Sequence, residues 1–132
     1  QAAVILAKLP HFPDEVEARS RIGARYSDLL GDVCRTPAIR LGNVHVYAQY
    51  TIRVPDCDAL GAKLKEAGIP TAVYYPKCLH EQPVFADLGY CYGDFPEAEK
   101  ASREVISLPM HPFLSNADQD RVVNAVKTAL KS

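Results

Sequence analysis

The spacing of apolar residues changes several times along the chain and predicts where helices and strands lie. Residues 1–9 read QAAVILAKL, a nearly all-apolar run of helix formers. A helix that is apolar on almost every side is normally buried between other elements. No N-cap residue and no initiator methionine precede this run. We therefore expect the helix to begin upstream of Gln1, with a natural domain edge as the alternative.

A second helix is predicted to start near Asp14, after Pro10 and Pro13 break the first one around residues 11–12. Its charged residues are typical of a solvated face. Its apolar residues recur at helical spacing and form one stripe, Ile22, Tyr26, Leu29, Leu30 and Val33.

Between His45 and Val54 the apolar period becomes two, which predicts a strand. One face is apolar and consists of Val46, Ala48, Tyr50, Ile52 and Val54. The opposite face is polar without being charged throughout, and consists of His45, Tyr47, Gln49, Thr51 and Arg53. Such a face either lines a cleft, meets a partner or is solvated, and the pattern leaves these possibilities open.

A helix, a strand and a long loop are predicted next. Asp56 or Asp58 caps a short helix, which ends at Gly68. Residues 69–75 read as a second strand. Residues 76–95 have no regular period, and a loop of this length is usually functional or holds short helical turns.

The remaining residues predict two helices around a short strand. Asp94 is expected to cap the first of them, with Glu97 at capping-box spacing. Residues 105–108 predict a third strand, and Ser115 starts the last helix, whose apolar stripe is Val122, Val126 and Leu130. We expect an α/β (α+β) fold with a small antiparallel or mixed sheet of about three strands and helices packed mainly on one side.

Composition narrows the class of protein. The chain has 132 residues, 48% of them hydrophobic, and a net charge of −1, so one globular domain is expected. A charge near zero gives no reason to expect nucleic acid or a membrane as partner. No membrane-spanning stretch and no signal peptide are visible. The four cysteines are widely spaced, which predicts reduced thiols in a cytoplasmic protein and no metal site.

The densest group of polar and aromatic residues lies at 74–80, which reads YYPKCLH. It follows a predicted strand, and ligands tend to bind at strand ends in α/β sheets. Two tyrosines, an imidazole and an ammonium group can stack on a ring and hydrogen-bond hydroxyls or phosphates. The alternative places Tyr75 in the core and Lys77 in water. Cys78 and His80 also suggest a Cys-His hydrolase, although a complete catalytic apparatus is missing.

Four segments together resemble one family. They are TAVYYP with HEQP at 71–76 and 80–83, QAAVILAKL at 1–9, VYAQYTIRV at 46–54, and GDFPEAEKASREVISLPMHPFL at 93–114. The chain resembles the C-terminal small domain of the DegT/DnrJ/EryC1/StrS family of PLP-dependent sugar-nucleotide aminotransferases. In this resemblance residues 1–132 are a single small domain, and residues 1–9 are the end of the interdomain helix.

The resemblance implies a bacterial, cytoplasmic homodimer of fold type I. Its cofactor is pyridoxal 5'-phosphate, bound mainly by a large domain upstream that carries the Schiff-base lysine. In the family this lysine stands before a Gly-rich stretch, and none of the seven lysines here does. No catalytic residue is therefore expected in this chain, and the isolated chain should be inactive. The reaction implied converts a nucleotide-linked keto-sugar to an amino-sugar, with glutamate as donor, for surface polysaccharide or lipopolysaccharide. Some relatives are dehydratases, and the residue that decides between the two lies upstream.

The resemblance also implies substrate-binding residues. Tyr74 stands where many members have His, whereas Tyr75, Pro76 and His80 match. We expect Tyr74, Tyr75 and His80 to position the sugar or its diphosphate without transferring protons, and Gln49 to be a weaker candidate for the same cleft. A different reading is a stand-alone α/β ligand-binding or regulatory module, in which the loop at 76–95 grips a ligand or protein.

Overall fold

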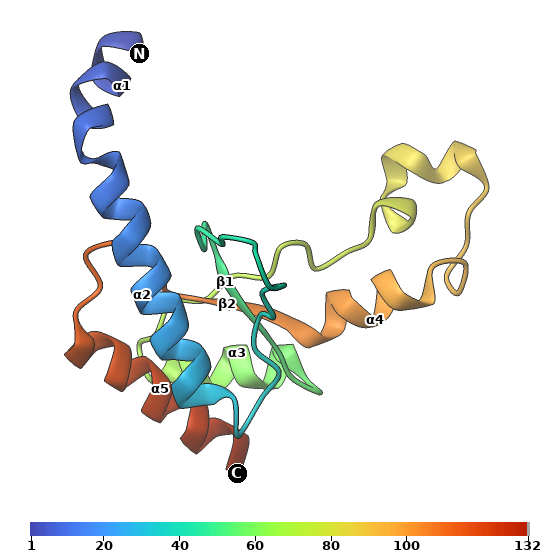
Figure 1. Ribbon diagram of the computed structural model, residues 1–132. Helices are drawn as coiled ribbons and strands as arrows, with labels where there is room; N and C mark the ends of the chain where they lie inside the picture. The colour runs from blue at the N-terminus through green and yellow to red at the C-terminus, as the bar shows by residue number, and fades with distance from the viewer. Residues whose placement is uncertain (132) are drawn as a thin grey trace.

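The computed structural model describes residues 1–131 and has five α-helices and two strands in this range (Figure 1). The elements, in chain order, are α1 (Ala2–Lys8), α2 (Phe12–Leu30), β1 (Tyr50–Arg53), α3 (Cys57–Glu66), α4 (Pro96–Glu104), β2 (Val105–Leu108) and α5 (Asn116–Lys131). Three 3-10 segments, Leu9–His11, Leu79–Glu81 and Pro83–Leu88, complete the regular structure.

The two strands pair antiparallel, with Tyr50 opposite Leu108 and Ile52 opposite Ile106. Single bridges extend the sheet on each side, from Arg35 to Arg53 and from Ala72 to Ser107. The predicted strand at 69–75 is therefore wrong, because it shrinks to one bridge.

Proline chemistry explains this short pairing. Ala72 and Ser107 exchange both backbone hydrogen bonds, at 3.2 and 2.7 Å. In an antiparallel ladder the next such pair toward the start of the segment would be Pro70 and Pro109. Neither has an N–H group to donate, so the ladder cannot extend in that direction.

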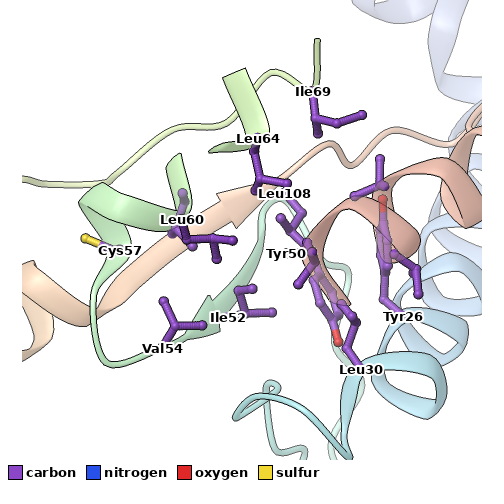
Figure 2. Close-up of a cluster of buried hydrophobic side chains, with 14 of the residues drawn as sticks. Tyr26, Leu30, Tyr50, Ile52, Val54, Cys57, Leu60, Leu64, Ile69 and Leu108 are labelled. Carbon is purple, nitrogen blue, oxygen red and sulfur yellow. The ribbon is translucent and has the colours of Figure 1, made fainter. Parts of the chain in front are cut away.

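One face of the sheet carries the core. Tyr50 and Ile52 on β1 and Ile106 and Leu108 on β2 are buried beneath α2, α3 and α5. Figure 2 shows side chains from these strands and helices meeting in one cluster, which includes Tyr26, Leu30 and Leu64. Each fully buried side chain of this size contributes roughly 1.5–3 kcal/mol of transfer free energy.

The other face of the sheet is polar. The hydroxyls of Thr51 and Ser107 lie 2.8 Å apart across the two strands, and Arg53 pairs with Glu104. The apolar face therefore takes the three covering helices. The predicted fold class, a small sheet with helices mainly on one side, is confirmed, with two strands and edge bridges in place of three full strands.

The strand predicted from residue 45 begins only at Tyr50, and the alternation fails before it. Tyr47 is buried, whereas Val46 is exposed, the reverse of the prediction. Tyr47 has a positive φ of 44°, and its N–H donates to Nδ1 of His45 at 2.9 Å. Its ring packs against Gly23 on α2, where a Cβ atom would clash with it. Local side-chain contacts thus replace ladder pairing in this segment.

The predicted break between the first two helices is confirmed in part, because α1 ends at Lys8 and α2 begins at Phe12, near the predicted start at Asp14. A 3-10 turn, Leu9–His11, joins α1 to α2, and the two helices follow each other as one long rod (Figure 1). Pro10 and Pro13 occupy the first positions of their helical segments, where no N–H group is required. α1 has no buried residue, and its apolar side chains are exposed, as is Phe12.

Two of the three predicted helix N-cap residues are confirmed, and the third is wrong. The Asp56 side chain accepts the N–H of Ala59 at 2.8 Å, and Ser115 accepts the N–H of Asp118 at 3.1 Å. Asp94 does not cap α4, because its carboxylate accepts the N–H of Cys91 at 2.8 Å. The N-cap position of α4 is Phe95.

Residues 76–104, here called the arm, consist of the long loop with its 3-10 turns followed by α4. The arm extends away from the rest of the protein in Figure 1. The short turns at Leu79–Glu81 and Pro83–Leu88 agree with the expectation for the loop. The four cysteines are free, and within residues 1–131 no cluster of metal-binding side chains and no helix suited to crossing a membrane is found.

Candidate functional site

Two hollows meet at Tyr74, where the chain leaves the sheet and enters the arm. The larger hollow has a volume of about 590 Å³, and Tyr74, Tyr75 and His80 help to line it. The smaller one has a volume of about 270 Å³ and is lined in part by Tyr74, Gln49 and Ser107. All four residues singled out from the sequence therefore line one or both of these hollows, which share Tyr74.

The two tyrosines present their rings to solvent at this junction. Tyr74 is 52% exposed and Tyr75 is 74% exposed. Their peptide bond is cis, and their rings are 6.3 Å apart at 89°. The alternative that placed Tyr75 in the core is thus wrong. Exposed phenol rings offer both a stacking surface and a hydroxyl donor to a ligand.

The smaller hollow combines a few polar side chains with mostly apolar ones. Ser107 lines it from β2, and Thr71 and Ala72 line it from the bridged segment. Gln49 is exposed and enters from the residue just before β1. Its amide adds both donors and an acceptor, so this hollow can hydrogen-bond hydroxyl groups. Of the five residues on the predicted polar face of the strand, Gln49 alone lines this hollow, so one position of that face borders a cleft.

His80 lies at the inner wall of the larger hollow. Its side chain is only 7% exposed, and Nε2 lies 3.0 Å from Oε1 of Glu99. The imidazole ring also contacts the ring of Phe95, with centroids 4.8 Å apart. These contacts orient the ring toward the protein, so His80 is placed to shape the wall.

Cys78 has partners other than His80. Its side chain accepts a backbone hydrogen bond from the third residue of the turn, and its N–H donates to Oε2 of Glu81 at 3.1 Å. Among the described residues no hydrogen bond joins Cys78 to His80, so the structure lacks the hydrogen-bonded pair that a Cys-His hydrolase needs.

Glu99 is the residue of this region that sequence reasoning missed. It is 2% exposed, and Oε1 accepts the N–H groups of Gly93 at 2.8 Å and Phe95 at 3.3 Å. Burial pushes the pKa of Glu99 upward, but these amides and His80 outweigh it and hold the pKa below its ordinary value. Its only sequence signal is an acidic residue near a helix start, a signal that Glu97 shares.

A family model for the "DegT/DnrJ/EryC1/StrS aminotransferase family" matches residues 1–127. The chain belongs to this family. It spans about a third of the length of the curated relatives and solved structures that it matches.

Two relatives illustrate the family. A "Pleiotropic regulatory protein" of Geobacillus stearothermophilus is 50% identical over 130 residues, which cover 96% of this chain and 35% of the relative. A "UDP-2-acetamido-2-deoxy-3-oxo-D-glucuronate aminotransferase" of Pseudomonas aeruginosa is 44% identical over 118 residues, covering 89% of this chain and 32% of the relative.

Solved structures share the fold described above. An aminotransferase of this family from Brucella abortus is 42% identical with a TM-score of 0.90, over 97% of this chain and 34% of that chain. S. venezuelae DesV, in complex with a ketimine intermediate, is 30% identical with a TM-score of 0.95, over 100% of this chain and 36% of that chain. NtdA from Bacillus subtilis, with bound cofactor PMP, is 26% identical with a TM-score of 0.75, over 89% of this chain and 29% of that chain.

The larger hollow does not offer the residue set that the family's cofactor needs. A PLP site needs a lysine for the Schiff base and an acidic residue at the pyridine nitrogen. The larger hollow has one lysine, Lys77, among its lining residues and no aspartate or glutamate. The lining of this hollow therefore does not fit PLP.

Proposed function

We propose that this chain is the C-terminal small domain, residues 1–132, of a PLP-dependent sugar-nucleotide aminotransferase. Three observations support this: family membership, a length about a third of that of the relatives, and the poor fit of PLP to the larger hollow. Residues 1–9 would be the end of the helix that leads from the large domain. The apolar side chains of α1, exposed in this structure, would then be covered by that domain.

The proposed reaction converts a nucleotide-linked keto-sugar to an amino-sugar, with glutamate as amino donor. PLP, held mainly by the large domain, would supply the amino-transfer chemistry. This chain would contribute Tyr74, Tyr75 and Gln49 as contacts for the sugar or its diphosphate. His80 would position the substrate by shaping the wall behind the two tyrosines.

The observation that carries this proposal is the position of Tyr74 between the two hollows. The aromatic hollow suits a ring, and the amide and hydroxyl groups that line part of the smaller hollow suit sugar hydroxyls, so a nucleotide-sugar matches both in chemistry. No group placed at the hollows is needed to move a proton in this role.

The test uses the full-length enzyme with glutamate and a panel of nucleotide keto-sugars, with the amino-sugar detected by mass spectrometry. Tyr74→Phe and His80→Ala should each raise the KM for the nucleotide-sugar more than they lower kcat. A large loss of kcat at unchanged KM would contradict a positioning role. The isolated chain, which lacks the Schiff-base lysine, should show no transfer.

The wider role we propose is surface polysaccharide synthesis, lipopolysaccharide included, by a cytoplasmic homodimer. Light scattering of the full-length enzyme tests the dimer, and a deletion strain lacking the amino-sugar in its surface polysaccharide tests the role. A monomer with full activity would contradict the first statement, and an unchanged polysaccharide would contradict the second.

A regulatory role without amino transfer is the second candidate. It is favoured by the name of the 50% identical relative, "Pleiotropic regulatory protein". In that case the full-length protein would bind a nucleotide-sugar without aminating it. Calorimetric binding combined with the mass-spectrometric assay separates the two candidates, because only the enzyme consumes glutamate.

A further inference from the structure

A buried carboxylate lies at the base of the arm and has no place among the proposed substrate contacts. Glu99 is 2% exposed. Its Oε1 atom accepts the N–H groups of Gly93 and Phe95 and lies 3.0 Å from Nε2 of His80. Three separate segments, the 3-10 turn, the turn before α4 and α4 itself, therefore meet at one oxygen atom.

The chemistry of this oxygen makes it a strong point of attachment. A buried carboxylate is tolerated only when its hydrogen-bonding capacity is filled. The donors around Glu99 hold its pKa below the ordinary value in spite of burial, so it is ionised at neutral pH. Hydrogen bonds to an ionised acceptor are roughly twice as strong as neutral ones.

His80 connects this attachment to the substrate side of the loop. The imidazole of His80 and the ring of Phe95 are in contact, and both line the larger hollow together with Tyr74 and Tyr75. Only residues 76–79 separate Tyr75 from His80 along the chain. A fixed imidazole therefore restricts where the two tyrosines can lie.

We propose that Glu99 is a positioning residue for substrate binding, which acts through His80 to hold the loop that carries Tyr74 and Tyr75. This inference rests on the proposed function, in which the two tyrosines contact the nucleotide-sugar. Glu99 itself touches neither the substrate nor the cofactor in this role.

Kinetics of the full-length enzyme provide the first test. Glu99→Ala should raise the KM for the nucleotide-sugar about tenfold, the loss expected for one charged hydrogen bond. The KM for glutamate should stay within about twofold, and Glu99→Gln, which keeps an acceptor oxygen, should recover most of the effect. Glu97→Ala, an exposed carboxylate on the same helix, is the matched control. A loss of kcat with both KM values unchanged would overturn the inference.

A double variant tests whether Glu99 acts through His80. If it does, His80→Ala combined with Glu99→Ala should have the KM of the single His80→Ala variant, within about twofold. Increases in KM that multiply would mean that the two residues act independently, and would overturn the inference.

Hydrogen exchange of the full-length enzyme gives a readout that does not depend on activity. Amides of residues 77–95 should exchange faster in Glu99→Ala than in the Glu97→Ala control, whereas amides of β2 and α5 should not change. Unchanged exchange in Glu99→Ala overturns the inference whatever the activity. If the unmodified enzyme transfers no amino group, the proposed function fails, and the role of Glu99 in substrate binding is rejected with it.

Discussion

The arm and the body of this protein are stabilised by different interactions. In the body, α2, α3 and α5 cover one face of the sheet with side chains such as Tyr26, Leu64 and Val126, all fully buried. In the arm, residues 76–104, Glu99 is the only buried residue. Apolar burial thus stabilises the body, whereas the one buried group of the arm is a hydrogen-bonded carboxylate, and many aromatic and aliphatic side chains of the arm are exposed.

The largest expected effect comes from emptying the core. Leu64→Ala removes a fully buried side chain on α3 and should lower the free energy of unfolding by about 2–5 kcal/mol. Leu88→Ala in the arm removes a side chain that is 63% exposed and should change it by less than about 0.5 kcal/mol. Urea unfolding of both variants measures the difference. Equal losses would remove the distinction between body and arm.

Gly23 on α2 and Gly61 on α3 are both helical glycines of the body, and they differ in how closely other side chains pack against them. Gly23→Ala places a Cβ atom against the Tyr47 ring and should destabilise the protein by about 1–3 kcal/mol. Gly61→Ala meets Ile106 Cδ1 at 3.4 Å, an ordinary contact, and should be neutral or stabilise by up to about 1 kcal/mol. Thermal unfolding of the pair tests this. A stabilised Gly23→Ala variant would show that Tyr47 moves without cost.

Alkaline pH should weaken the body before it affects the arm. Burial raises the pKa of Tyr50 to about 12, in spite of its hydrogen bond with Ser27. A group whose folded pKa is raised contributes stability below its ordinary value of 10.0, and this contribution is lost as the pH rises from there toward 12. Urea midpoints across this range measure the loss. Tyr50→Phe should show a flatter profile, and an unchanged slope would contradict the assignment.

Protonation of Glu99 at acid pH should have the smallest effect on the free energy of unfolding, because the interactions that it removes lie within the arm. The pKa of Glu99 is lowered in the folded protein, so its contribution is present above the ordinary value of 4.5 and is lost as the pH falls through the folded pKa. Amide exchange of residues 77–95, corrected for intrinsic rates, should then accelerate relative to α5. In Glu99→Gln this acid dependence should disappear. If it persists, another group controls the arm.

The candidate site was only partly predictable from the sequence. The cluster at 74–80 stood out by composition, and the structure places Tyr74, Tyr75 and His80 at one hollow. The partner of His80 was missed, because Glu97 and Glu99 look alike in sequence near the start of α4. Which of the two turns inward depends on where the arm folds back, and no local pattern records that.

The sequence by itself determined α2, α3, α5 and β2. Their apolar periods and capping residues are local signals, since they depend on neighbours a few positions apart. It also determined that one face of β1 is apolar and the other polar. The order of these elements was enough to predict a small sheet with helices on one side.

Only the tertiary structure decided where β1 begins, how far the segment at 69–75 pairs, and which acid His80 meets. Each outcome depends on residues distant in sequence: the Tyr47 ring against Gly23, Pro70 opposite Pro109, and Glu99 beneath the 3-10 turn. Pairings of this kind are set by packing and by the supply of backbone donors across the fold. Local periodicity contains no information about either.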